Sequence, residues 1–207
     1  MSIKVKCQMP KAVIFDLDGT LVSSSLDFTA IREQTACVPG QDLLEYMAGL
    51  PPTKKARVAE IIREHEMADA HTCELLPGVD AMLARLDGLN IRTAIVTRNS
   101  APATRIKLAR TGIQLEQVLT REDAPAKPAP DALLGLAKQW GLPNEECVYV
   151  GDYVYDLEAA QRANMHACLY ASKGVPSFSE KAHFVYQHHA DFETALRNYW
   201  LSIAIEP

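Results

Sequence analysis

The sequence predicts an α/β fold, an open parallel sheet with helices on both faces and a small all-helical segment inserted after the first strand. Three observations predict it. From residue 77 onward, short apolar runs alternate with helical patterns. An apolar run at residues 11–15 precedes this alternation and ends abruptly at acidic residues and glycine. Between the two, residues 23–76 carry only helical periodicity.

The elements follow in chain order. Residues 11–15 are expected to form a buried parallel strand, because the run has no polar face. The inserted segment is expected to hold three helices, over residues 26–37, over 42–48 and from an N-cap at Thr53 toward His71. After Pro77-Gly78, strands are expected over 92–96, 117–119, 146–150, 166–170 and 183–186, with helices between them. We expect a core domain of residues 1–22 and 77–207 and a helical domain of residues 23–76.

The composition favours a globular protein without nucleic-acid or membrane partners. The chain has 207 residues, of which 48% are hydrophobic, and a net charge of −5. No run of Lys and Arg exceeds two residues, so no basic patch is visible. No apolar stretch approaches the ~18–20 residues of a membrane span, and residues 1–10 lack the apolar region of a signal peptide.

The cysteines favour a reducing compartment. Five are present, scattered and without a Cys-x-x-Cys pair: Cys7, Cys37, Cys73, Cys147 and Cys168. This pattern argues against a zinc site and against a full disulfide framework. We therefore expect idle or buried thiols and a cytoplasmic protein.

Polar residues stand where the predicted strands end or a helix begins. They are Asp16, Asp18, Thr97, Lys127, Asp152 and Asp156. In parallel sheets, ligands bind at the carboxyl ends of the strands, so we expect these side chains to share one edge. Clustered carboxylates need a cation, and their hard oxygens suit Mg²⁺. A carboxylate can attack phosphorus, a second can exchange protons with the leaving group and water, and a hydroxyl and an ammonium can hold phosphoryl oxygens.

These motifs resemble the haloacid dehalogenase superfamily, in its phosphatase branch with a helical cap, which includes phosphoglycolate phosphatase and β-phosphoglucomutase-like enzymes. The matching segments are residues 16–21 (Asp-Leu-Asp-Gly-Thr-Leu), residues 96–99 (Val-Thr-Arg-Asn), Lys127-Pro128, and Gly151-Asp152 with Asp156. The resemblance covers nearly the whole chain and implies a Rossmann-like core with residues 23–76 as the cap. Tyr153 departs from the pattern, since relatives usually carry a small polar residue there.

The resemblance implies a role for each matching residue. Asp16 is implied as nucleophile and magnesium ligand, and Asp18 as acid/base with its main-chain oxygen on the metal. Asp152 is implied as a further ligand, and Asp156 as a residue that orients metal waters or Lys127. Thr97, Arg98, Asn99 and Lys127 are implied as the residues that bind the phosphate. Arg32 and Lys54 are candidate cap contacts for the leaving group.

The expected function is Mg²⁺-dependent hydrolysis of a small phosphorylated metabolite through an aspartyl-phosphate on Asp16. Asp18 favours P–O cleavage over dehalogenation, because attack on carbon needs no acid at that position. Two alternatives stay open: a β-phosphoglucomutase-like phosphomutase, and a catalytically idle binding or regulatory module. Thr20 favours a phosphatase over a mutase. The sequence does not distinguish a monomer from a dimer, and it does not identify the metabolite.

Overall fold

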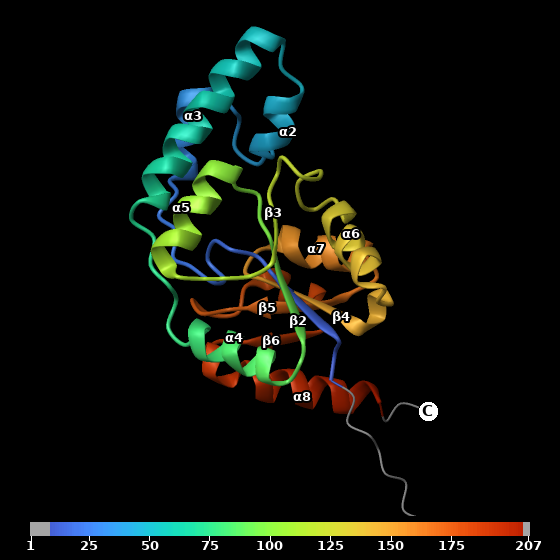
Figure 1. Cartoon of the computed structure of the whole chain (residues 1–207). Coiled ribbons are helices and arrows are strands. Elements are labelled where there is room, and N and C mark those ends of the chain that lie inside the picture. The colour runs from blue at the N-terminus through green and yellow to red at the C-terminus, as the bar shows by residue number, and fades with distance from the viewer. Residues whose placement is uncertain (1–8, 205–207) are drawn as a thin grey trace, which may run out of the picture.

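A parallel sheet with the strand order β3-β2-β1-β4-β5-β6 lies at the centre of the protein (Figure 1). The computed structural model describes residues 9–204. The strands are β1 (Ala12–Phe15), β2 (Arg92–Val96), β3 (Gln117–Leu119), β4 (Cys147–Gly151), β5 (His166–Tyr170) and β6 (Phe184–Tyr186). The predicted α/β fold is confirmed, and each predicted strand agrees with the observed one to within one residue at either end.

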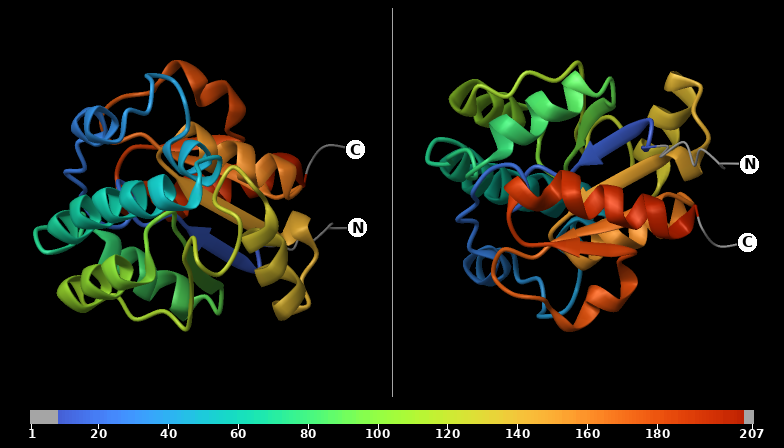
Figure 2. Two further views of the ribbon diagram at one scale, coloured as in Figure 1. Left: turned by 90° about the horizontal axis from the view of Figure 1, so that it is seen from above. Right: turned by 90° about the horizontal axis from the view of Figure 1, so that it is seen from below.

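Helices cover both faces of the sheet (Figure 2). They are α1 (Phe28–Thr35), α2 (Leu43–Ala48), α3 (Pro52–Ala70), α4 (Val79–Gly88), α5 (Ala101–Thr111), α6 (Asp131–Trp140), α7 (Val154–Arg162) and α8 (Phe192–Ile203). Short 3-10 turns are η1 (Asn144–Glu146), η2 (Ser177–Lys181) and η3 (His189–Asp191). Alternate residues of β1 point to opposite faces. Val13 and Phe15 therefore join the apolar cluster under α4 and α8, whereas Ala12 and Ile14 join the one under α6 and α7.

The strand register brings the chemistry-bearing loops together. Central strand β1 is fully buried and pairs in parallel with both β2 and β4. Phe15, its last residue, lies opposite Ile95 on one side and Val150 on the other. The residues that follow β1, β2 and β4 consequently emerge at the same edge of the sheet.

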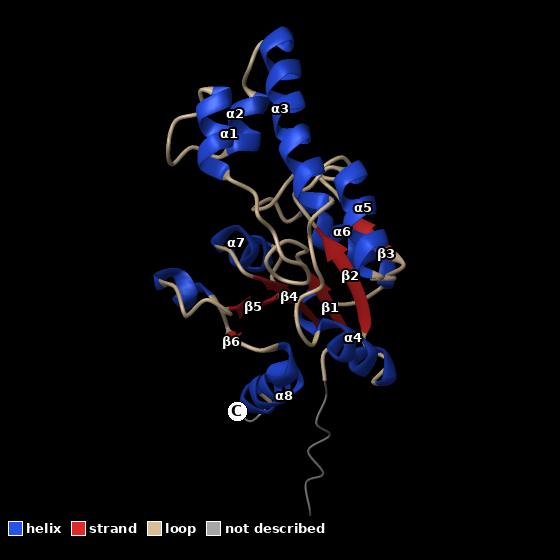
Figure 3. Ribbon diagram, turned by 90° about the vertical axis from the view of Figure 1, so that its left-hand side faces the viewer, coloured by secondary structure: helices blue, strands red, loops and turns tan. Residues whose placement is uncertain are grey.

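The helices α1, α2 and α3 stand together beyond this edge (Figure 3). They share a small apolar cluster made of Ile31, Cys37, Leu43, Val58 and Ile62. The two connections to the sheet run side by side, because the Ser23 amide donates to the Glu74 carbonyl (2.8 Å) and the Leu76 amide to the Leu21 carbonyl (3.0 Å).

The start of α3 differs from the prediction. Thr53 was expected to cap this helix, but the helix begins at Pro52, and Pro51 occupies the cap position without a side-chain hydrogen bond. Proline suits the first helical turn, since its fixed φ is helical and its missing N–H would have no partner there. The predicted N-cap at Thr53 is therefore wrong.

Some predictions concern residues outside 9–204. Residues 1–8, which include Cys7 and most of the N-terminal stretch, lie outside the described part. The four described cysteines are buried free thiols: Cys37, Cys73, Cys147 and Cys168. Among the described helices, none combines the length and apolar character needed to cross a membrane.

Candidate active site

Three carboxylates converge at the carboxyl edge of the sheet. Asp16 directly follows β1, Asp152 follows β4, and Asp156 lies in the first turn of α7. One oxygen from each lies within 4.8 Å of the others. The parallel pairing of β1 with β4 produces this arrangement, because it brings the ends of the two strands next to each other.

A buried lysine links two of these carboxylates. The Nζ atom of Lys127 lies 2.7 Å from Oδ1 of Asp16 and 2.7 Å from Oδ1 of Asp156. It also donates to the hydroxyl of Tyr149 (2.6 Å), which in turn donates to the Val96 carbonyl (3.0 Å). All three protons of the ammonium thus have acceptors, and the lysine is fixed in place.

Sequence reasoning missed Tyr149. It is a tyrosine in the middle of a fully buried strand, and a buried tyrosine hydroxyl needs a polar partner. That signal says that a partner exists but does not say which one. Here the partners are Lys127, the Val96 carbonyl and Oδ1 of Asp156 (3.2 Å), so Tyr149 connects the end of β2 to the lysine and the acidic group.

The carboxylates repel each other in the absence of a cation. Burial raises the pKa of Asp16 to about 7, with the Lys127 ammonium opposing this rise and Asp156 adding to it. Burial and the charges of Asp16 and Asp156 raise the pKa of Asp152 to about 8. One ammonium faces three carboxylates, so negative charge is in excess. This donor set of three carboxylates, which are buried or partly buried, fits a hard divalent cation such as Mg²⁺.

Two glycines let the loops approach this closely. Gly19 has a φ of +75°, and a Cβ atom placed on it would lie 2.3 Å from Oδ2 of Asp152. A Cβ on Gly151 would lie 2.2 Å from the carboxyl carbon of Asp156. Any larger residue at either position would displace a carboxylate. The glycines of both motifs are therefore required by close packing around the acidic group.

The Asp18 side chain points to a different set of partners. Its two oxygens accept hydrogen bonds from the Asn99 amide and from the ammonium of Lys107 on α5. Burial raises the pKa of Asp18, and the Lys107 charge counteracts this. The carboxylate group within 4.8 Å comprises Asp16, Asp152 and Asp156 but not Asp18. Sequence reasoning identified Asn99 but missed Lys107.

The residues after β2 divide between the sheet edge and the helical segment. Thr97 is buried, and its hydroxyl accepts a hydrogen bond from the backbone N–H of Asn99 (3.2 Å). The Arg98 guanidinium forms an ion pair with Asp42, which is the N-cap of α2. It also donates a hydrogen bond to the Lys127 carbonyl, and its central carbon lies 4.8 Å from the centroid of the Tyr155 ring. The Arg98 guanidinium is thus occupied by protein groups and joins α2 to the sheet edge.

Arg32 and Lys54 have no contact with the carboxylates in the described structure. Arg32 donates to the carbonyls of Phe28 (3.4 Å) and Gln41 (3.2 Å), both within the helical segment. Lys54 is exposed in the first turn of α3, and this end of α3 points away from the sheet (Figure 1). Tyr153, the residue that departs from the family pattern, is also exposed, and only its amide reaches the site, donating to Asp156 (3.0 Å).

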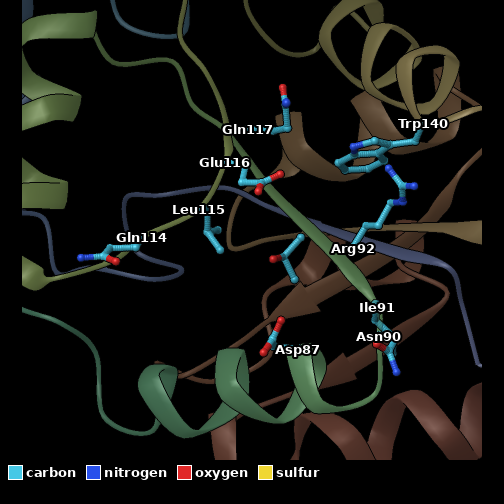
Figure 4. Close-up of a pocket in the computed structure, with 10 residues that line it drawn as sticks. Asp87, Asn90, Ile91, Arg92, Gln114, Leu115, Glu116, Gln117 and Trp140 are labelled. Atoms are coloured by element: carbon cyan, nitrogen blue, oxygen red, sulfur yellow. The ribbon is translucent and has the colours of Figure 1, made fainter.

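A cleft of about 390 Å³ lies elsewhere, beside the start of β2 (Figure 4). Its lining includes Asp87, Arg92, Glu116 and Trp140. Because it adjoins the amino end of β2, it lies at the opposite edge of the sheet from the carboxylates. None of its residues belongs to a predicted motif.

Comparison with known proteins identifies the family. A family model described as haloacid dehalogenase-like hydrolase matches residues 13–170, most of the chain. The chain belongs to this family. A haloacid dehalogenase-like hydrolase domain-containing protein of Arabidopsis thaliana is 30% identical over 176 residues, which cover 79% of this chain and 72% of the relative.

A curated phosphatase among the relatives places this haloacid dehalogenase-like hydrolase in the phosphatase branch, as the sequence predicted, and a solved structure supports the fold. A phosphoglycolate phosphatase of Xanthomonas campestris is 31% identical over 181 residues, covering 76% of this chain and 81% of that enzyme. The crystal structure of a hydrolase from Pseudomonas syringae superimposes with a TM-score of 0.78 at 25% identity, covering 92% of this chain and 99% of the other.

Proposed function

We propose that the chain is a Mg²⁺-dependent phosphomonoester hydrolase that forms a transient aspartyl-phosphate on Asp16. The observation that carries the proposal is the position of Asp16, beside the Lys127 ammonium and within a group of three carboxylates. A carboxylate there can attack phosphorus while a fixed positive charge meets the phosphoryl oxygens. The ligands proposed for Mg²⁺ are Asp16, Asp152 and the Asp18 main-chain oxygen, with Asp156 supporting them. Bound Mg²⁺ would supply neutralisation of the developing charge.

The residues of the chain would act in two steps. First, an Asp16 oxygen forms a bond to phosphorus as the P–O bond to the alcohol breaks, and Asp18 gives its proton to the departing oxygen. Second, Asp18 takes a proton from water, whose oxygen attacks the same phosphorus, so that inorganic phosphate leaves and the Asp16 carboxylate is restored. Thr97, Asn99 and Lys127 are proposed to hold the phosphoryl oxygens.

Residues 23–76 are proposed to act as a cap over this site. The helical segment reaches the sheet edge through the Arg98–Asp42 pair and through a second pair of Arg121 with Glu66 of α3. A cap that meets the core in this way restricts entry to small substrates and excludes bulk water. We therefore propose a small phosphorylated metabolite as substrate, and a cytoplasmic enzyme without nucleic-acid partners. Phosphoglycolate is the first candidate to test, because a phosphatase of that compound is among the relatives.

A phosphate-release screen across phosphorylated metabolites tests the proposal. The purified protein is assayed with Mg²⁺ and with a chelator, and Asp16→Asn serves as the matched variant because it keeps the shape of the side chain. We expect Mg²⁺-dependent release that the variant lacks. Retained turnover in Asp16→Asn would remove the proposed nucleophile. Turnover that requires a sugar bisphosphate, with no net phosphate release, would favour the phosphomutase alternative.

A further inference from the structure

A lysine outside every motif is completely buried beside the site. Lys107 lies on α5 with no exposed surface. Its ammonium contacts Oδ1 of Asp18 and lies 2.6 Å from Oδ2 of Asp69. Full burial of an ammonium is costly unless carboxylates compensate for the lost water. The two carboxylates therefore explain how a lysine is tolerated at this position, and their locations suggest what it does.

Lys107 and Asn99 together fix the carboxyl group of Asp18. The lysine donates to one oxygen and the Asn99 amide to the other. A carboxylate held at both oxygens has its plane and its direction determined. General acid catalysis depends on such geometry, because the proton must lie within hydrogen-bond reach of the departing oxygen.

Asp69 in turn holds Lys107 in place from the helical segment. It lies near the end of α3 and is buried. Its oxygens accept hydrogen bonds from the hydroxyls of Ser24 (3.2 Å) and Ser25 (3.0 Å), in the connection that leads from the sheet to α1. Lys107 thus joins Asp18 to the connection at the base of the proposed cap.

We propose that Lys107 is a positioning residue that holds Asp18 in the direction required for proton transfer, and that Asp69 anchors it. This rests on the proposed function, in which Asp18 is the acid. A general acid typically contributes ~10²–10⁴-fold, and its misplacement should remove at least about 10-fold of that. The loss should appear only for leaving groups that need a proton.

The test compares two substrates in Lys107→Met. An alkyl phosphate has a poor leaving group, whereas p-nitrophenolate departs without protonation. The measured quantity is the rate of the first step, followed as the burst of released alcohol or phenol in rapid-quench experiments with Mg²⁺. We expect a fall of at least about 10-fold with the alkyl phosphate and less than about 3-fold with p-nitrophenyl phosphate. Substrate affinity should be unchanged for both.

Matched variants separate positioning from folding. Arg105→Met alters an exposed cation on the same helix and should change neither rate. In Lys107→Met the Asp69 carboxylate would be left buried and unpaired, which could impair folding. The double variant Lys107→Met/Asp69→Asn removes that charge as well. It should show the same selective loss of rate with the alkyl phosphate.

Two results would overturn the inference. Equal losses with both substrates would show a merely structural role for Lys107, as would unchanged rates in the folded double variant. Either result would leave the proposed function standing if the wild-type enzyme turns over both substrates. A wild-type protein without turnover on any phosphomonoester would overturn the proposed function and this inference together.

Discussion

The ammonium nitrogen of Lys127 lies 2.7 Å from Oδ1 of Asp16. Asp16 directly follows the central strand, and Lys127 comes from the loop before α6, so the contact joins segments that are distant in sequence. The pair is buried, and neither group could be charged there alone at low cost. The lysine thus supports the negative charge of Asp16 in the folded protein and supplies positive charge where a phosphoryl group would bind.

Replacing Lys127 by methionine should abolish activity and reduce stability. The variant leaves Asp16 and Asp156 without their shared cation, and breaking a buried pair in this way costs about 3–5 kcal/mol. We expect a fall in kcat of at least about 10³-fold, since the group would stabilise the transition state directly. Phosphate release and thermal unfolding measure the two effects. Lys138→Met on the exposed side of α6 is the control. Activity within a few-fold of wild type in Lys127→Met would contradict the assignment.

Gly19→Ala should damage the site far more than an ordinary glycine substitution. The new Cβ would lie 2.3 Å from Oδ2 of Asp152, and the φ of +75° disfavours alanine by about 1–2 kcal/mol. We expect weaker Mg²⁺ binding and loss of activity. Gly135→Ala is the matched control, because Gly135 lies in α6 with nothing within 4 Å of the new methyl group. It should raise stability by about 0.5–1 kcal/mol. Titration calorimetry measures the Mg²⁺ affinity of both variants. Equal Mg²⁺ affinity in Gly19→Ala and Gly135→Ala would contradict the role of close packing at Gly19.

The metal-free protein should lose stability as the pH rises. Asp16 and Asp152 have pKa values of about 7 and about 8 when folded, whereas unfolded aspartate titrates near pH ~4. The folded state therefore binds more protons than the unfolded state between these values, and the free energy of unfolding falls as pH rises through that window. Mg²⁺ should reverse this, because it binds the ionised carboxylates.

The measurement is the melting temperature against pH, with chelator and with Mg²⁺. The stabilisation by Mg²⁺ should be larger at about pH 8 than at about pH 5. Asp152→Asn provides the comparison, since it removes one of the two raised pKa values and should flatten the metal-free curve. Parallel curves for wild type and variant would count against the acidic group as the source of the effect.

Local patterns predicted the sheet because each strand is a short apolar run between turn residues. The run before Asp16 is buried on both faces, as its lack of a polar face indicated. The end of each such run was also recognisable, and parallel strands place those ends at one edge. That rule accounts for the convergence of Asp16, Asp152 and Asp156.

What the sequence did not reveal depends on contacts between distant elements. In the sequence, Lys107 looks like an ordinary surface lysine of a helix. It is buried in the structure because the carboxylates of Asp18 and Asp69 pair with its ammonium group. Arg98 belongs to a phosphate-site motif, yet Asp42 of the helical segment engages it. No periodicity encodes such pairs, because each joins side chains from elements that are distant in sequence.

Detection of the covalent intermediate tests whether Asp16 is the nucleophile. The enzyme is mixed with substrate and Mg²⁺, quenched with acid, treated with borohydride and digested for mass spectrometry. Borohydride reduces an aspartyl-phosphate to homoserine, so the modified residue records where the phosphoryl group was bound. We expect homoserine at position 16 in the wild-type enzyme and none in Asp16→Asn. Homoserine at another aspartate, or none in an enzyme that turns over substrate, would rule out a phosphorylated Asp16.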